Sequence, residues 1–208
     1  HKIVYNTNGK IPSVQDQLYS GPITITGDAN LQAGVVVNNK ITDVASASFS
    51  INKATGANLI QLTNAPKAPY NKSGNNGFIN GIVANDTRFS DGEWLAWEGK
   101  DIDATLSFAA PTAISKISTR FYNSRGSWIH LPTSVEVLGS QDGKTYTRLG
   151  MLQNLDNSKE GAVTVLFEIK ATTVQYMKLV AHPVTMIPAG FAGAGNPSWL
   201  FMDELIIK

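Results

Sequence analysis

Acidic side chains surround two tryptophans near the middle of the chain. Asp91, Glu93 and Glu98 flank Trp94 and Trp97. Two carboxyl groups that face each other are the usual machinery for cleaving a glycosidic bond, one as the acid and the other as base or nucleophile. No apolar stretch beside them would keep one carboxyl protonated next to its partner. We therefore interpret these residues as solvated loop carboxylates and assign no catalytic residue.

The remaining polar residues exclude several other kinds of active site. The chain has no cysteine, which excludes disulfides, thiolate metal sites and cysteine nucleophiles. His130 and His182 lie far apart, and their spacing does not match a zinc site. Gly193 and Gly195 do not lie between a strand and a helix, so they do not predict a phosphate-binding loop.

Aromatic and polar residues in loops are stronger candidates for binding. The apolar face of a sugar ring stacks on aromatic side chains, while arginine and carboxamide groups orient its hydroxyls. The loop positions that offer such groups are Tyr70, Tyr122, Arg125, Trp128, Phe191 and Trp199. The loops at 123–127 and 186–198 hold two of them, Arg125 and Phe191. The alternative is that these rings pack in the core, as we expect for Trp94 and Trp97.

Charge and hydropathy exclude two classes of partner. The chain has 17 basic and 16 acidic residues, which does not provide the basic face that nucleic acids require. No apolar run approaches the roughly eighteen residues of a membrane-spanning helix. The sequence begins at His1 with neither a methionine nor a signal peptide, so we expect it to be a piece of a longer protein.

Alternating polar and apolar residues predict an all-β protein. The short segments 23–26, 103–108, 113–122, 162–169 and 174–181 each predict a separate strand. Asp142 and Gly143 predict a two-residue hairpin turn. Residues 1–56 predict a small immunoglobulin-like β-sandwich, and residues 57–208 predict about eight strands in a jelly-roll β-sandwich.

The first segment carries the signature of a known accessory domain. It consists of Val4–Gly9, Pro12 with Ser13, and Tyr19–Ile23. These residues resemble the small β-sandwich domain that follows the catalytic barrel in bacterial β-hexosaminidases and other glycosidases. The resemblance implies a spacer domain without catalytic residues.

The second segment resembles the discoidin-like domain, which is also the fold of family 32 carbohydrate-binding modules. The matching residues, in order, are Ile79–Gly81, Trp94–Gly99, Asp103–Phe108, Trp128–Pro132, Val135–Val137, Ser140–Gly143 and Phe201–Ile207. The tryptophan-rich motifs are similar to the C-terminal region of family 20 β-hexosaminidases. Both segments thus resemble the tail of a chitobiase-like glycoside hydrolase.

The second resemblance also implies a structural calcium ion. Discoidin-like domains often hold one calcium with a loop after the hydrophobic-Asp-Gly step and an acidic residue near the last strand. Carried over to this chain, the ligands are Asn80, Asn85, Asp86 and Glu204. Asn80 replaces the usual aspartate and removes one negative charge, so we expect weaker calcium binding here.

The resemblance implies a non-catalytic glycan-binding region in a secreted, periplasmic or cell-surface bacterial enzyme. Galactose- or N-acetylhexosamine-containing glycans are the implied ligands, and the upstream catalytic domain of the same polypeptide is the implied partner of a monomeric module. Two alternatives remain open from the sequence. The alternatives to glycan binding are a structural appendage packed on the catalytic domain and a protein-adhesion module.

Overall fold

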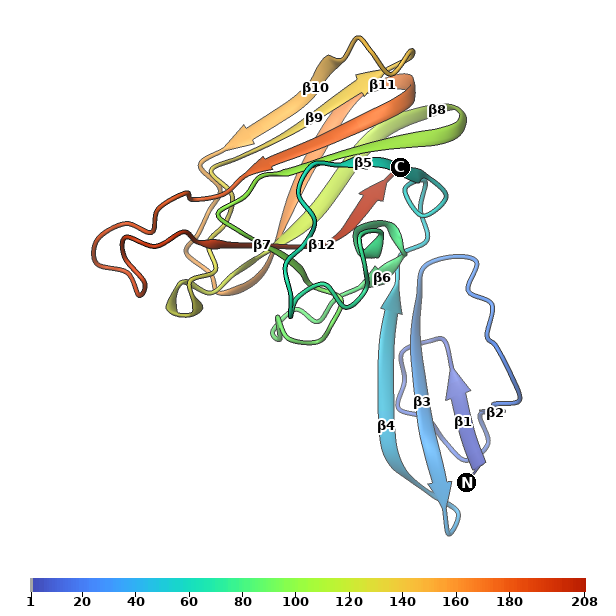
Figure 1. Cartoon of the computed structure of the whole chain (residues 1–208). Coiled ribbons are helices and arrows are strands. Elements are labelled where there is room, and N and C mark those ends of the chain that lie inside the picture. The colour runs from blue at the N-terminus through green and yellow to red at the C-terminus, as the bar shows by residue number, and fades with distance from the viewer. Residues whose placement is uncertain (1) are drawn as a thin grey trace. The chain divides into compact units, whose positions relative to one another are not determined.

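The computed structural model describes residues 2–208 and consists almost entirely of antiparallel β-strands (Figure 1). Twelve strands and two short 3-10 helices make up the regular structure of this part of the chain. The chain divides into two units. One comprises the residues up to Ile51 together with Gly81–Val83, and the other comprises Asn52–Asn80 and Ala84–Lys208. The all-β prediction is confirmed.

The first unit contains one five-stranded sheet in the order β2-β1-β3-β4-β6. Its strands are β1 (Lys2–Asn6), β2 (Gln17–Leu18), β3 (Ala29–Val37), β4 (Lys40–Phe49) and β6 (Ile82–Val83). β3 and β4 form a hairpin through Asn38 and Asn39, which have φ angles of 49° and 59°. Two consecutive left-handed residues match the right-handed twist of the flanking strands, and asparagine tolerates that conformation.

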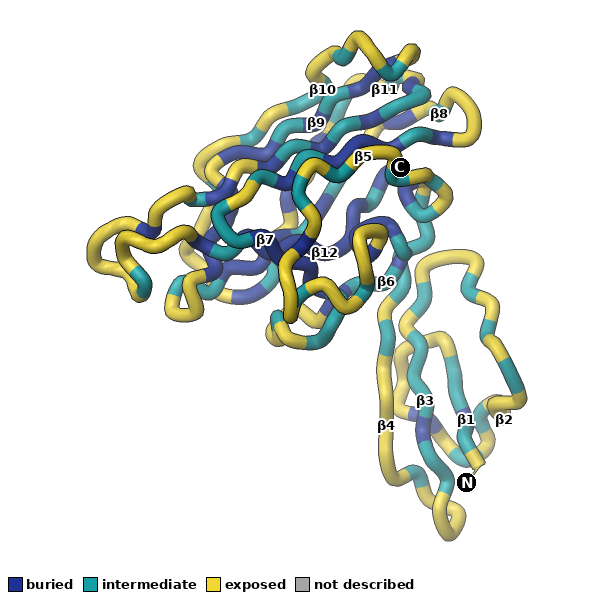
Figure 2. Tube along the Cα trace, viewed as in Figure 1, coloured by how far each residue is buried: buried dark blue, intermediate teal, exposed yellow. Residues whose placement is uncertain are grey.

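Few side chains of the first unit are buried (Figure 2). Val4 is fully buried, whereas Ile11 is 82% exposed and Leu18 is 52% exposed. The strand predicted at 23–26 is wrong, because that segment has no ladder partner among the described residues and runs as a loop. The immunoglobulin-like assignment of this unit stays a prediction.

The second unit contains a seven-stranded sheet in the order β10-β9-β11-β8-β12-β7, in which β5 also pairs with β8. The strands are β5 (Asn58–Leu62), β7 (Leu95–Glu98), β8 (Ile102–Asn123), β9 (Ser134–Ser140), β10 (Thr147–Gln153), β11 (Gly161–His182) and β12 (Trp199–Ile207). The 3-10 helices are η1 (Gly77–Ile79) and η2 (Arg125–Ser127).

β8 and β11 are each 22 residues long and belong to both layers of the sandwich. The first half of β8 pairs with β5 and the second half of β11, which also pairs with β9. The second half of β8 pairs with the first half of β11 and with β12. The four separate strands predicted at 103–108, 113–122, 162–169 and 174–181 are therefore two bent strands.

The bend lies where the β8–β11 ladder is interrupted. Thr112 pairs with Val174 and Ser107 pairs with Tyr176, so residues 108–111 of β8 have no partner in this ladder. Pro111 lies in this stretch and has no N–H to donate. The chain stays extended through the interruption and passes from one layer to the other, as bulged strands do in bent sheets.

The space between the two layers is filled by one large hydrophobic core. Trp97, Phe121, Met177 and Leu205 are among its members, and each is at most 1% exposed. The Asp142–Gly143 turn forms, with a φ angle of 71° at Gly143. It lies within a connection of residues 141–146 between β9 and β10, so the predicted two-residue turn is wrong. No helix of the described residues has the length and apolar character needed to span a membrane.

Candidate functional site

Three loops at one end of the second unit enclose a hollow of about 200 Å³. They follow β8, β10 and β11. The last residues of β10 and β11 both pair with Ser134 at the start of β9, and the end of β8 pairs with the start of β11, to which the loop after β10 leads. The lining residues are Asn123, Arg125, His130, Leu131, Pro132, Thr133, Asn154, Leu155, Asn157 and Val184. The volume is below the roughly 300–1,000 Å³ of pockets for drug-sized ligands, so it suits one small ring.

The loop after β8 is tightly folded around η2. Ser124 and Ile129 form a β-bridge across it, and the N–H of Trp128 donates to the carbonyl of Arg125. Trp128 has a φ of 65° and its side chain is partly exposed. A bulky residue in the left-handed region costs free energy, and such strain is concentrated at functional sites.

The loop 183–198 after β11 packs against this tryptophan. Gly193 is so close to the indole that an added Cβ would lie 2.4 Å from Cε2 of Trp128. Ile187 is buried and fixes the loop through backbone hydrogen bonds with Gly195 and Asn196. The loop is therefore ordered by its own hydrogen bonds and by the packing of Gly193 on the Trp128 indole.

Phe191 at the tip of that loop meets two residues that line the hollow. The Arg125 guanidinium lies 5.2 Å from the centroid of the Phe191 ring, and the His130 ring meets Phe191 edge-to-face at 5.9 Å. Of the six predicted binding residues, Arg125, Trp128 and Phe191 are thus brought together at one end of the sandwich. Whether they bind a ligand stays a prediction.

Asn123 and His130 bring buried polar atoms to the hollow. The amide of Asn123 donates to the carbonyls of Asn157 at 3.1 Å and Lys159 at 2.6 Å, which ties the loop after β10 to β8. Within residues 2–208, neither Oδ1 of Asn123 nor Nε2 of His130 has a hydrogen-bond partner. Buried polar atoms of this kind are normally hydrogen-bonded to the protein or to an ordered water molecule.

The imidazole of His130 is held in its neutral form. Burial lowers the pKa of His130, the positive charge of Arg125 lowers it further, and the charge of Glu160 opposes this shift. At neutral pH the ring therefore offers one nitrogen as acceptor and one as donor. From the sequence, His130 was considered only as a possible zinc ligand, because nothing local marks its proximity to Asn123 and Phe191.

The other three predicted binding residues lie in a separate aromatic cluster. Tyr70 meets Trp199 at 5.5 Å and Phe201 at 4.7 Å between ring centroids, and Tyr122 meets Trp94 at 5.1 Å. Trp94 and Phe201 are fully buried and Tyr122 is nearly so. The structure does not bring Tyr70, Tyr122 or Trp199 into the lining of the hollow.

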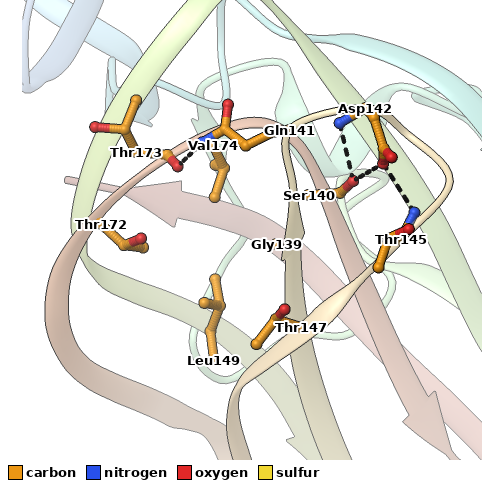
Figure 3. A pocket seen from close by; sticks show the side chains of 10 residues that line it. All are labelled: Gly139, Ser140, Gln141, Asp142, Thr145, Thr147, Leu149, Thr172, Thr173 and Val174. Carbon is orange, nitrogen blue, oxygen red and sulfur yellow. Dashed lines mark hydrogen bonds between the residues drawn. The ribbon is translucent and has the colours of Figure 1, made fainter.

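A second hollow, of about 370 Å³, lies at the other end of β9 (Figure 3). Its polar groups are already engaged with one another. The Asp142 carboxylate accepts hydrogen bonds from the Ser140 hydroxyl and from the N–H of Thr145, and the Gln141 amide donates to the carbonyl of Thr173. This hollow is larger, but it has neither an aromatic ring nor an arginine in its lining.

The residues that the resemblance assigned to calcium are spread over three elements. Asn80 follows η1, and its amide donates to Glu93 at 3.1 Å. Asn85 and Asp86 lie in the loop 84–91, and Glu204 is fully buried in β12. No group of three or more histidine or acidic side chains within residues 2–208 is arranged to hold a metal ion.

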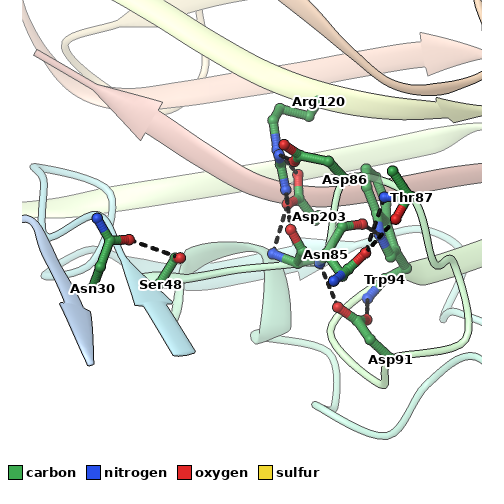
Figure 4. A network of polar contacts seen from close by, with 10 residues as sticks. Asn30, Ser48, Asn85, Asp86, Thr87, Asp91, Trp94, Arg120 and Asp203 are labelled. Carbon is green, nitrogen blue, oxygen red and sulfur yellow. Dashed lines mark hydrogen bonds and ion pairs between the residues drawn. The ribbon is translucent and has the colours of Figure 1, made fainter. Parts of the chain in front are cut away.

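Arg120 of β8 connects the loop 84–91 to β12 (Figure 4). Phe121 pairs with Met202 and Thr119 with Leu205, so one β8 residue, Arg120, lies opposite two of β12. The guanidinium contacts both oxygens of Asp203, the carboxylate of Asp86 and the carbonyl of Ala84.

Comparison with known proteins gives a structural likeness alone. No protein-family model and no curated protein matches the chain. The family 32 carbohydrate-binding module of Streptococcus pneumoniae EndoD matches with 13% identity over 76% of this chain and 99% of that chain, at a TM-score of 0.50. The C-terminal domain of a chitobiase from Bacteroides fragilis matches with 20% identity over 75% and 95% of the two chains, at a TM-score of 0.44.

A further match is a structure from Clostridium perfringens, CpGH89CBM32-5 in complex with GalNAc-β-1,3-galactose. Its identity is 18% over 74% of this chain and 96% of that chain, at a TM-score of 0.47. The sequence identities limit these comparisons to the fold, and of the three structures named the Streptococcus pneumoniae module reaches a TM-score of 0.50. The two-layered antiparallel sandwich of the second unit therefore has the fold of a family 32 carbohydrate-binding module.

Proposed function

We propose that the second unit is a non-catalytic module that binds a terminal sugar residue in the hollow beside His130. The observation that carries the proposal is the convergence of an arginine, a neutral buried imidazole and a buried carboxamide on one small cavity, with an exposed phenyl ring in contact with the arginine and the imidazole. Carbohydrate sites combine aromatic faces for the ring with a few fixed polar groups for its hydroxyls.

Each residue has a distinct part in this interaction. Phe191 offers an apolar face at the rim, and Trp128 supports the loop that carries it. Arg125 donates to sugar hydroxyls or to an acetamido carbonyl, since a guanidinium has donors and no acceptor. His130 and Asn123 accept hydrogen bonds from hydroxyl groups. Galactose- and N-acetylhexosamine-type sugars, which the sequence resemblance implies, are the first ligands to test.

The proposal extends to the longer protein that the sequence resemblance implies. In it, the first unit is a spacer and the second unit is the targeting module of a secreted, periplasmic or surface-bound β-hexosaminidase-like enzyme. A tethered module of modest affinity raises the effective substrate concentration for its catalytic partner. This role requires neither a catalytic residue in the module nor its self-association.

Isothermal titration with galactose, N-acetylgalactosamine and N-acetylglucosamine tests this function. Loss of a hydrogen bond to a charged donor costs about 1.5–3 kcal/mol, so Arg125→Ala should weaken binding roughly 10- to 100-fold. The matched control is Arg148→Ala, because Arg148 is exposed on β10 and pairs with Glu136. If none of the three sugars binds, or if both variants bind equally well, the hollow is not the glycan site.

A structural appendage is the second candidate, and the surface of the first unit favours it. Leu18, Tyr19 and Val44 are 46–52% exposed, and Ile11 is 82% exposed, although the sheet has few buried side chains of its own. Exposed apolar residues on a thin sheet are typical of a surface that packs against another domain. Ile11→Ser with Leu18→Ser should then leave sugar binding unchanged and reduce the thermal stability of the full-length enzyme. Equal stability would contradict this role.

A further inference from the structure

The first three backbone carbonyls of the loop 84–91 accept hydrogen bonds from donors of the chain itself. The carbonyl of Ala84 accepts from Arg120 Nη2 at 2.7 Å, and that of Asn85 accepts from the indole N–H of Trp94 at 2.9 Å. The carbonyl of Asp86 accepts from the N–H of Ala162 at 3.0 Å. Three consecutive carbonyls therefore already have partners.

The side-chain oxygens of the loop are engaged as well. Oδ1 of Asn85 accepts from both the N–H and the hydroxyl of Thr87, at 3.0 and 3.1 Å. The Asp86 carboxylate pairs with Arg120. The Asp91 carboxylate accepts from the N–H groups of Asn85 and Glu93. Calcium binds six to eight oxygen ligands, and this loop would have to break several of these hydrogen bonds to provide them.

Arg120 occupies the place between the loop and β12 that a bridging cation would take. Its Nε lies 3.2 and 3.0 Å from the two oxygens of Asp203, which also accepts the N–H of Ala84 at 3.0 Å. Asp203 is fully buried, and the Arg120 side chain is only 13% exposed. The guanidinium also lies 5.3 Å from the Trp94 ring centroid, an attractive geometry for a cation.

The surroundings act on both members of the pair. Burial raises the pKa of the Asp203 carboxyl, and the hydrogen bonds and charge of Arg120 oppose that rise. Burial acts to lower the pKa of Arg120, but the hydrogen bonds and charges of Asp203 and Asp86 outweigh it and leave the pKa above the ordinary value. The guanidinium therefore carries its positive charge at every pH at which the protein is folded. A divalent cation placed among the same oxygens would be repelled at short range by this charge.

We propose that Arg120 is the resident cation of this domain: its guanidinium joins Ala84 and Asp86 to Asp203, and the domain folds and functions without calcium. The discoidin-like resemblance implies a metal at this loop, whereas the donors and charges of the loop favour the side chain. This inference does not depend on the sugar site, since none of its residues lines the hollow.

Thermal unfolding of the whole chain, in excess calcium chloride and in excess chelator, tests the proposal. The unmodified protein should melt at the same temperature in both. Arg120→Met leaves Asp203 buried without its counter-charge, so the melting temperature should fall by on the order of 10 °C in both conditions. Arg148→Met removes an exposed ion pair and should change the melting temperature by less than about 3 °C.

Two further measurements remain decisive if Arg120→Met does not fold. The double variant Arg120→Met with Asp203→Asn removes both charges and should recover part of the lost stability. Calcium titration of the unmodified protein by calorimetry should show no binding heat. A saturable binding heat, a higher melting temperature in calcium, or an Arg120→Met variant as stable as Arg148→Met would each overturn the proposal.

Discussion

The contact between Gly193 and Trp128 allows a single methyl group to test the loop that carries Phe191. Gly193 has a φ of 79°, and a Cβ there would lie 2.4, 2.5 and 2.7 Å from three indole atoms. Real Cβ atoms do not approach neighbours this closely, so Gly193→Ala must displace either the indole or the loop. Gly195→Ala is the matched control, because it has a φ of 86° and open space around its Cα.

Both substitutions place an alanine at a left-handed φ, and only Gly193→Ala also creates a steric clash with the indole. An alanine at a left-handed φ costs about 1–2 kcal/mol at either position. The clash at Gly193 adds about 1–3 kcal/mol, which is the usual range for overpacking. The loop avoids this second cost by moving away from Trp128, and Phe191, two residues earlier in the sequence, then leaves its position over Arg125.

Calorimetric titration with the best of the three sugars measures the consequence. Gly193→Ala should bind about 10-fold more weakly or worse, which is the loss expected when an interaction worth about 1–3 kcal/mol is broken. Gly195→Ala should bind within about twofold of the unmodified protein. Equal affinities for the two variants would show that the loop 183–198 is not part of the site, whatever their effect on stability.

Three other predictions follow from contacts of the second unit. Because His130 has a lowered pKa, the folded state binds fewer protons than the unfolded state as the pH falls through about 6.5. The free energy of unfolding, measured with urea, should therefore decrease as the pH drops through that value. A His130→Gln variant whose unfolding free energy changes with pH just as steeply would contradict this. Asn123→Ala removes the two hydrogen bonds that hold the loop after β10, so proteolysis should cut at 154–160 faster, and an unchanged cleavage rate would exclude this tie. Trp94→Phe leaves the Asn85 carbonyl without its donor, so denaturant titration should show a free energy of unfolding lower by about 1–3 kcal/mol. An unchanged free energy of unfolding would show that water replaces the indole as donor.

Local sequence patterns predicted the β class because alternation along a strand reflects which face is buried. Asp103–Phe108 alternates and lies in a strand, as predicted. The same local patterns do not show where one strand ends. The segments 103–108 and 113–122 were predicted as separate strands, whereas the structure shows an extended chain with an interrupted ladder. Continuity of that kind depends on partners far away in the sequence.

The candidate site was predictable only where a residue type was informative by itself. Arg125, Trp128 and Phe191 were selected because aromatic rings stack on sugars and arginine orients their hydroxyls, but the same criterion also selected Tyr70, Tyr122 and Trp199, which lie in another cluster. His130 and Asn123 were not selected, since their roles depend on the packing of β8 against the loops after β10 and β11. Arg120 is the extreme case. In the sequence it is one more polar residue of an alternating strand, and only its register with β12 places it beside Asp203.

The uneven burial of the four tryptophans provides an intrinsic optical probe of the site. Trp94 and Trp97 are at most 1% exposed, Trp199 is half-buried, and Trp128 is 38% exposed. A collisional quencher such as iodide should therefore reduce the emission of Trp128 first. A sugar that settles against the Arg125 loop would shield that indole and shift its emission to shorter wavelength. Ligand binding could then be followed on the unlabelled protein at concentrations too low for calorimetry.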